Sequence, residues 1–251
     1  MSMGERTIRE VLKRRSEDTQ RVLQQQRSMK TGGLRRRVRG LRNLLIVIVL
    51  IIAAALAYSG WLVNQVITRF AADRTANLTG GSDVTLDLHS AMQFLPDTLL
   101  AATDPNFYST GNLSVSPVTQ RLVRIYFPNS PAVTADLMAI ALQYTYSRTD
   151  ILQNYINEVP VGLDHDRPVH GFAAAGEVYF KKPIAQLQPQ DIALLVALAT
   201  GSKSLDPRAD PARALLLRNR VLQQNVEQQV LNQVQVNLLK KTPLDLAPGS
   251  S

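Results

Sequence analysis

A run of 20 uncharged residues, positions 44–63, most constrains what this chain can fold into. As a helix it would be about 30 Å long, which matches the hydrocarbon core of a bilayer. Tyr58 and Trp61 lie near its far end, where aromatic side chains anchor a span at the interface. We therefore expect a transmembrane helix over residues 44–64 rather than a buried core helix. A cleaved signal peptide does not fit, because 43 residues precede a run that is too long for one.

The balance of basic and acidic residues differs before and after this run. Residues 1–43 hold 13 Lys/Arg and 4 Asp/Glu, whereas the rest of the 251-residue chain holds 15 basic and 16 acidic residues. The positive-inside rule predicts a basic cytoplasmic segment over 1–43, a single-pass protein of the inner membrane, and a main domain in the periplasm. We expect the cell membrane as a partner and no nucleic acid, since the basic residues lie outside the fold. The chain has no cysteine, which excludes disulfides and thiolate chemistry.

The remainder of the chain has the pattern of a helical domain. After a juxtamembrane linker over 65–92, apolar residues recur at helical spacing in segments 96–103, 119–126, 134–157 and 189–200. A further helix is predicted from Pro211, with Asp210 as its cap, to about residue 239. Alternation typical of strands is not evident, so the sequence predicts a mostly α fold.

Several motifs of this domain resemble those of a known family. The run "YSRTDILQNYINEVPVG" (146–162) resembles the Tyr-Ser-Lys-(acid)-Ile-Leu-x-x-Tyr-(hydrophobic)-Asn pattern of glycosyltransferase family 51. The runs "GFAAAGEVYFKKPIAQLQPQDIALLVAL" (171–198) and "DPRADPARALLLRNRVL" (206–222) resemble its later helices. The similarity is greatest to the b-type class A penicillin-binding proteins, which share the Asn-Glu-Val at 157–159.

The resemblance implies a fold and an activity. Members of this family polymerise lipid II into the glycan chains of peptidoglycan, on a lysozyme-like α-helical domain. The family domain would span residues 93–223 here, and a C-terminal helix and tail would span 224–251.

The resemblance also marks what this chain lacks. "LLAATDPNFY" (99–108) aligns with a family motif whose catalytic glutamate is replaced here by Thr103, and the second functional glutamate falls on Ala135. A threonine hydroxyl cannot accept a proton near neutral pH as a carboxylate can. Asp104 and Asp136 each lie one residue later, which on a helix turns the side chain by about 100°. We therefore expect no intact catalytic residue.

A second motif, "SVSPVTQRLVR" (114–124), aligns with the family's Gly-(Gly/Ala)-Ser-Thr-(Leu/Ile)-Thr-Gln-Gln-Leu-Val-Lys, with Arg121 in place of the second glutamine. Only seven residues separate Tyr108 from Ser116, whereas the family has a much longer segment that roofs its cleft. From the retained motifs we predict substrate contacts at Ser116, Thr119, Gln120, Arg124, Arg148 and Asn157.

Three functional hypotheses follow. We favour a catalytically dead pseudoenzyme that acts as a scaffold or regulator of peptidoglycan synthesis or of a wall-spanning machine, with a peptidoglycan synthase or another envelope protein as its partner. The alternatives are an active polymerase that uses displaced carboxylates, and a module that binds lipid II or glycan strands. No cofactor or metal is expected. Asp164, His165, Asp166 and His170 include metal-ligating types, but their Gly/Pro-bounded position favours a solvated loop.

Overall fold

The computed structural model describes residues 17, 20–21, 40–73, 94–111, 114–201 and 205–249. The chain divides into two compact units, Met1–Gly60 and Trp61–Ser251. Most of the basic segment 1–43 lies outside the described residues.

One helix of the described chain, Gly40–Asp73, is long and apolar enough to cross a membrane. The large apolar side chains from Leu44 to Leu56 are exposed around the helix, as lipid-facing residues would be. The helix continues past the predicted span, so residues 65–73 of the predicted linker are helical. The reason is packing: Leu62, Val66 and Phe70 recur every four residues on one face and are buried in the core of the second unit. The rest of the predicted linker, 74–93, lies outside the described residues.

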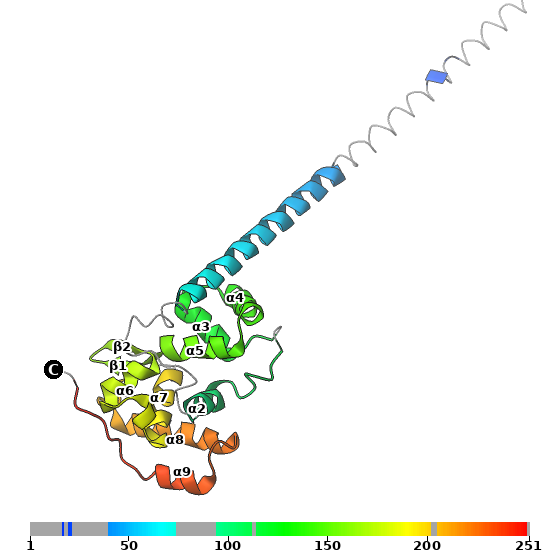
Figure 1. Cartoon of the computed structure of the whole chain (residues 1–251). Coiled ribbons are helices and arrows are strands. Elements are labelled where there is room, and N and C mark those ends of the chain that lie inside the picture. Colours follow the sequence, from blue (N-terminus) through cyan, green and yellow to red (C-terminus); the bar gives the residue numbers. More distant parts are fainter. Residues whose placement is uncertain are drawn as a thin grey trace, which may run out of the picture. The chain divides into compact units, whose positions relative to one another are not determined.

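The second unit is mostly α-helical, which confirms the predicted fold class (Figure 1). Its helices are α2 (Phe94–Thr103), α3 (Pro117–Tyr126), α4 (Ala132–Thr145), α5 (Arg148–Glu158), α6 (Phe172–Phe180), the 3-10 turn η1 (Ile184–Gln186), α7 (Pro189–Thr200), α8 (Pro211–Glu227) and α9 (Gln233–Leu239).

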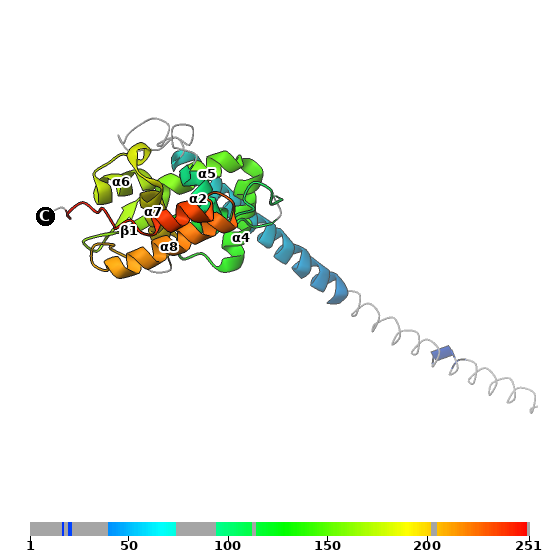
Figure 2. The same ribbon diagram turned by 90° about the horizontal axis from the view of Figure 1, so that it is seen from below.

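Helix α7 forms the centre of this core. All eight residues from Asp191 to Leu198 are buried, as expected for a helix that is apolar on every side. Helices α2 and α8 pack against it, as does strand β1 (Pro160–Asp164) (Figure 2). The first turn is closed by a reciprocal capping box, in which Gln188 and Asp191 each accept a hydrogen bond from the other's backbone N–H.

The predicted helix 134–157 is two helices in the structure. Tyr146 has extended backbone angles, and Ser147 begins α5 as its cap, with Oγ accepting a hydrogen bond from the Asp150 N–H at 3.1 Å. A serine favours a helix start because its side chain satisfies an otherwise unpaired donor. The break is therefore caused by the Ser147 cap, which the spacing of apolar residues does not predict.

The predicted helix 211–239 also breaks. Helix α8 ends at Glu227, Gln229 has a left-handed φ of 59°, and Asn232 caps α9 by accepting from the Gln235 N–H at 2.9 Å. The regular spacing of valines through this glutamine-rich stretch predicted one continuous helix, and that prediction is wrong.

A short antiparallel hairpin was also not predicted. Strand β1 pairs with β2 (Arg167–His170) through a turn in which His165 and Asp166 have positive φ. Gly162 in β1 also has positive φ, and a Cβ there would lie 2.5 Å from the Tyr179 hydroxyl, which donates to the Leu163 carbonyl at 2.8 Å. Glycine is therefore required for the close approach of β1 to α6.

Arg218 fastens α9 to α8 from within the core. Its side chain is fully buried, and the guanidinium donates to the Thr242 carbonyl at 2.8 Å and to the Lys240 carbonyl at 3.3 Å. These carbonyls follow the end of α9, where no further helical turn can pair with them.

Replacing Arg218→Ala should lower the free energy of unfolding by about 2–4 kcal/mol. The change removes both the charge-assisted hydrogen bonds of the guanidinium and the packing of its aliphatic stem. The midpoint of urea unfolding measures the change. Arg213→Ala is the matched control, since Arg213 is exposed on the same helix, and it should change stability by less than about 0.5 kcal/mol. Equal midpoints for the two variants would show that Arg218 does not fasten α9.

Candidate functional site

Thr103, at the predicted position of the catalytic base, is turned onto its own helix. It is the last residue of α2, and its hydroxyl donates to the Leu99 carbonyl at 2.6 Å. Ala135 lies in the first turn of α4, fully buried, with only a methyl group. Neither position offers a group that takes up a proton near neutral pH.

The nearby carboxylate of Asp104 is used to hold the structure together. Asp104 is only 5% exposed, and its Oδ2 accepts a hydrogen bond of 2.6 Å from the Ser116 hydroxyl. Ser116 is also the cap of α3, with its Oγ accepting from the Thr119 N–H. Its own N–H donates to Gln143 on α4 at 2.9 Å. One buried cluster therefore joins the end of α2 to α3 and α4.

Asp136, which lies one residue after the second expected glutamate position, is also hydrogen-bonded within the domain. Its Oδ1 accepts a hydrogen bond from the Gln120 side-chain amide, which spans from α3 to α4. The active-polymerase hypothesis requires Asp104 or Asp136 to face the substrate. Neither side chain lines a described cavity.

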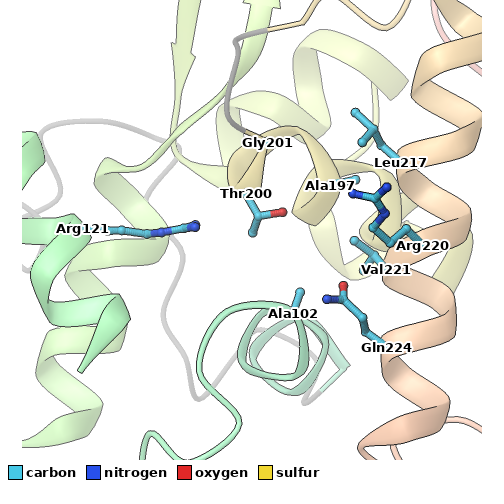
Figure 3. A pocket seen from close by; sticks show the side chains of 9 residues that line it. All are labelled: Ala102, Arg121, Ala197, Thr200, Gly201, Leu217, Arg220, Val221 and Gln224. Carbon is cyan, nitrogen blue, oxygen red and sulfur yellow. The ribbon is translucent and has the colours of Figure 1, made fainter. Parts of the chain in front are cut away.

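Two cavities flank the C-terminal end of α7. The larger, about 780 Å³, is lined by Arg121, Arg124, Ile125, Pro128, Tyr155, Val159, Pro160, His170, Ala199, Thr200 and Gly201. The smaller, about 290 Å³, is lined by Ala102, Arg121, Ala197, Thr200, Gly201, Leu217, Arg220, Val221 and Gln224. They share Arg121, Thr200 and Gly201. In Figure 3, Arg121 extends from α3 toward Thr200, while Gln224 and Arg220 come from α8.

The cavities are cationic. Three arginines, Arg121, Arg124 and Arg220, line them, and no Asp or Glu does. Within the described part of the chain, none of the three pairs with a carboxylate. A guanidinium without an acidic partner is well suited to bind phosphate or carboxylate, often through two parallel hydrogen bonds.

Tyr155 is a buried aromatic residue in the wall of the larger cavity. Burial raises the pKa of its phenol, while the neighbouring Arg121 guanidinium acts in the opposite direction. The hydroxyl therefore stays protonated at neutral pH, and it is buried with no hydrogen-bond partner among the described residues.

The structure divides the predicted substrate residues into two groups. Arg124 is exposed and lines the larger cavity. Ser116 and Thr119 are fully buried, and Gln120 is held by Asp136. Arg148 donates to the Thr110 carbonyl at 2.8 Å and lies over the Phe107 ring. Asn157 is half-buried and lines neither cavity. As ligand-binding residues all six, Arg124 included, stay predictions.

Sequence reasoning missed Arg121, Arg220 and Thr200 as cavity residues. The substitution of Arg121 for the family glutamine was one available signal. Arg220 and Gln224 lie four residues apart on one face of α8, which was another. Neither signal identified a common site, because the three elements that supply these residues are far apart in the sequence.

The hairpin loop has ion pairs of its own. Asp164 accepts from Arg208 at 2.8 Å and lies 3.1 Å from His165 Nδ1. Across the described ranges, no group of three or more His, Asp or Glu side chains is placed to hold a metal ion.

Comparison with known proteins identifies related chains. Residues 115–226 match the family described as Transglycosylase. The chain is 31% identical over 179 residues to Penicillin-binding protein 1B of Escherichia coli (strain K12), covering 61% of this chain and 21% of that protein. It is 28% identical over 184 residues to Penicillin-binding protein 1B of Haemophilus influenzae (strain ATCC 51907 / DSM 11121 / KW20 / Rd), covering 63% and 24%.

A solved structure, Penicillin-Binding Protein 1A from Haemophilus influenzae, matches with 18% identity and a TM-score of 0.45. That match covers 66% of this chain and 18% of the other. The predicted resemblance to glycosyltransferase family 51 is confirmed by the family match over residues 115–226 and by the related sequences. The matched part of the chain spans less than a quarter of the length of the first of these relatives.

Replacing Ser116→Ala should destabilise the domain by about 2–4 kcal/mol, because it removes the cap of α3 and leaves the buried Asp104 carboxylate without its donor. Thermal or urea unfolding of the purified protein measures the loss. Ser109→Ala is the control, since Ser109 is exposed and donates only to the nearby Asn106 carbonyl. A Ser116→Ala protein as stable as the control would contradict the role of this cluster.

Proposed function

Because residues 115–226 match the transglycosylase family, we propose that this protein is a catalytically inactive relative of the peptidoglycan glycosyltransferases that binds an anionic glycan precursor. The observation that carries this proposal is the chemistry of the two cavities. Among the described residues, their lining contains three arginines and no carboxylate. The site keeps the charge that holds an anion, and its described lining offers no carboxylate to act as a base.

The missing base is decisive for catalysis. Glycan polymerisation requires a group that takes the proton from a sugar hydroxyl as it attacks the anomeric carbon. Loss of a general base alone costs about 10²- to 10⁴-fold in rate. Thr103 and Ala135 cannot supply that base, and the carboxylates of Asp104 and Asp136 are held by Ser116 and Gln120.

The ligand we propose is the lipid-linked pyrophosphate of lipid II. Its phosphate oxygens match the guanidinium groups of Arg121, Arg124 and Arg220. The apolar side of the larger cavity, formed by Ile125, Pro128 and neighbouring residues, suits the first part of an isoprenoid chain. Thr200 would donate to a glycan or phosphate oxygen.

Binding without turnover suits a scaffold or regulator. We propose a single-pass protein with its N-terminus in the cytoplasm and its domain in the periplasm, consistent with the basic residues before the apolar span. The protein partner would be a peptidoglycan synthase or another component of the envelope machinery.

The double variant Arg121→Gln, Arg220→Gln should bind fluorescent lipid II at least tenfold more weakly than the unmodified chain. Each lost charge-assisted hydrogen bond is worth about 1.5–3 kcal/mol, and 1.4 kcal/mol corresponds to a tenfold change in affinity. Microscale thermophoresis of the full chain in detergent measures the affinity, with Arg213→Gln on α8 as the exposed control. An unmodified chain that does not bind, or a double variant that binds as tightly as the control, would refute the proposed site.

Restoring both glutamates, Thr103→Glu with Ala135→Glu, should not restore polymerisation. The carboxylate introduced in place of Ala135 would be buried in the first turn of α4, where an unpaired charge is unfavourable, so the variant should also be less stable. The shortened segment between Tyr108 and Ser116 also leaves the site without the family's roof. Gel analysis of products from lipid II provides the readout, and glycan polymer from this variant would count against the proposal.

A further inference from the structure

His170 lies in the wall of the larger cavity, among residues that are already cationic. It is the last residue of β2, its side chain is exposed, and it lines the cavity together with Arg121 and Arg124 of α3. Histidine is the side chain whose ordinary titration falls between pH 5 and 8, whereas arginine stays charged throughout that range. The cavity therefore combines a fixed positive charge with one group whose charge depends on pH.

One hydrogen bond orients the His170 ring. Its Nδ1 lies 3.2 Å from the carbonyl oxygen of Glu158, and a carbonyl oxygen can only accept a hydrogen bond. In the neutral ring the proton is therefore on Nδ1, which leaves Nε2 as the second polar atom. Glu158 is the last residue of α5, and the C-terminal end of a helix stabilises a nearby positive charge. The same contact thus suits both the neutral ring and the imidazolium.

The charged groups around His170 act differently in the empty and the occupied cavity. Arg121 and Arg124 disfavour a positive ring while the cavity is empty, and no carboxylate among the described residues lines the cavity. Outside the lining, ionisable side chains on the elements next to β2 and on its hairpin are Glu158, Asp164, His165, Asp166, Arg167 and Glu177. An anion bound between the arginines and the ring would offset the repulsion, and it would favour uptake of a proton by the ring.

We propose that His170 is a pH-dependent ligand of the anion in the larger cavity, so that the domain binds a lipid-linked pyrophosphate more tightly as the pH falls. This inference rests on the proposed function, because it concerns the same cavity and the same class of ligand. The protonated ring would donate from Nε2 to a phosphate oxygen, beside the guanidinium groups of Arg121 and Arg124. In the neutral ring Nε2 carries a lone pair instead, which cannot donate to that oxygen.

The chemistry of the ligand attributes the pH dependence to the protein. Each phosphorus of a lipid-linked sugar pyrophosphate carries one ester and one anhydride bond. It therefore lacks the second ionisation that a phosphate monoester has near pH 6. Because the pyrophosphate keeps its charge between about pH 5.5 and 8, a change in its affinity over this range reflects titration of the protein.

Three variants of the full-length chain separate the charge of His170 from its bulk. His170→Gln removes the titration and keeps a polar side chain, whereas His170→Arg keeps a positive charge at every pH tested. His165→Gln is the matched control, because His165 is exposed in the same hairpin and lines neither described cavity. Microscale thermophoresis in detergent measures the affinity for fluorescent lipid II across about pH 5.5 to 8, and circular dichroism at each pH checks that every variant is folded.

We expect the unmodified chain and His165→Gln to bind lipid II about three- to tenfold more tightly at the acidic end of the range than at the basic end. His170→Gln should show a flat profile at the weaker affinity, and His170→Arg a flat profile at the tighter one. Binding with the same pH profile in the unmodified chain and His170→Gln would overturn this inference and leave the proposed function intact. An unmodified chain that binds lipid II at no pH would overturn both.

Discussion

The buried hydrogen bond between Ser116 and Asp104 is the contact on which the arrangement of the candidate site depends. It fixes the end of α2 against the start of α3, and Gln143 brings α4 into the same cluster. Helix α3 then presents Arg121 and Arg124 to the cavities. The same bond removes from solvent the carboxylate nearest to the lost catalytic position.

The parts of this structure that were predictable are those with a strong local signal. Helix α7 was predicted with its observed ends, because its apolar run begins after Pro189 and ends before Gly201. The ends of α2 and α3, at Thr103 and Tyr126, were also predicted correctly. By contrast, the breaks at Ser147 and Asn232 depend on single capping side chains within periodic sequence, where pattern alone favours one long helix. The hairpin was missed because its two strands are too short for alternation to be visible.

For the candidate site, the sequence predicted only which expected catalytic positions carry another residue. Thr103 and Ala135 stand out because the motif around each is otherwise recognisable, whereas a cavity is a property of the assembled fold. Arg121 and Arg220 approach the same cavity from α3 and α8, and Thr200 approaches it from the end of α7. Their proximity depends on how α2 and α8 pack around α7. Three arginines that can attract an anion line the cavities, while the carboxylates of Asp104 and Asp136 are hydrogen-bonded to Ser116 and Gln120.

The central claim is that this domain binds a peptidoglycan precursor and does not polymerise it. The most direct measurement incubates the purified full-length protein with fluorescent lipid II, using a class A penicillin-binding protein as the active reference, and follows binding and glycan chain length in the same sample. The account predicts saturable binding with lipid II recovered as monomer after times at which the reference has consumed it. Glycan polymer formed by the unmodified chain would contradict the account.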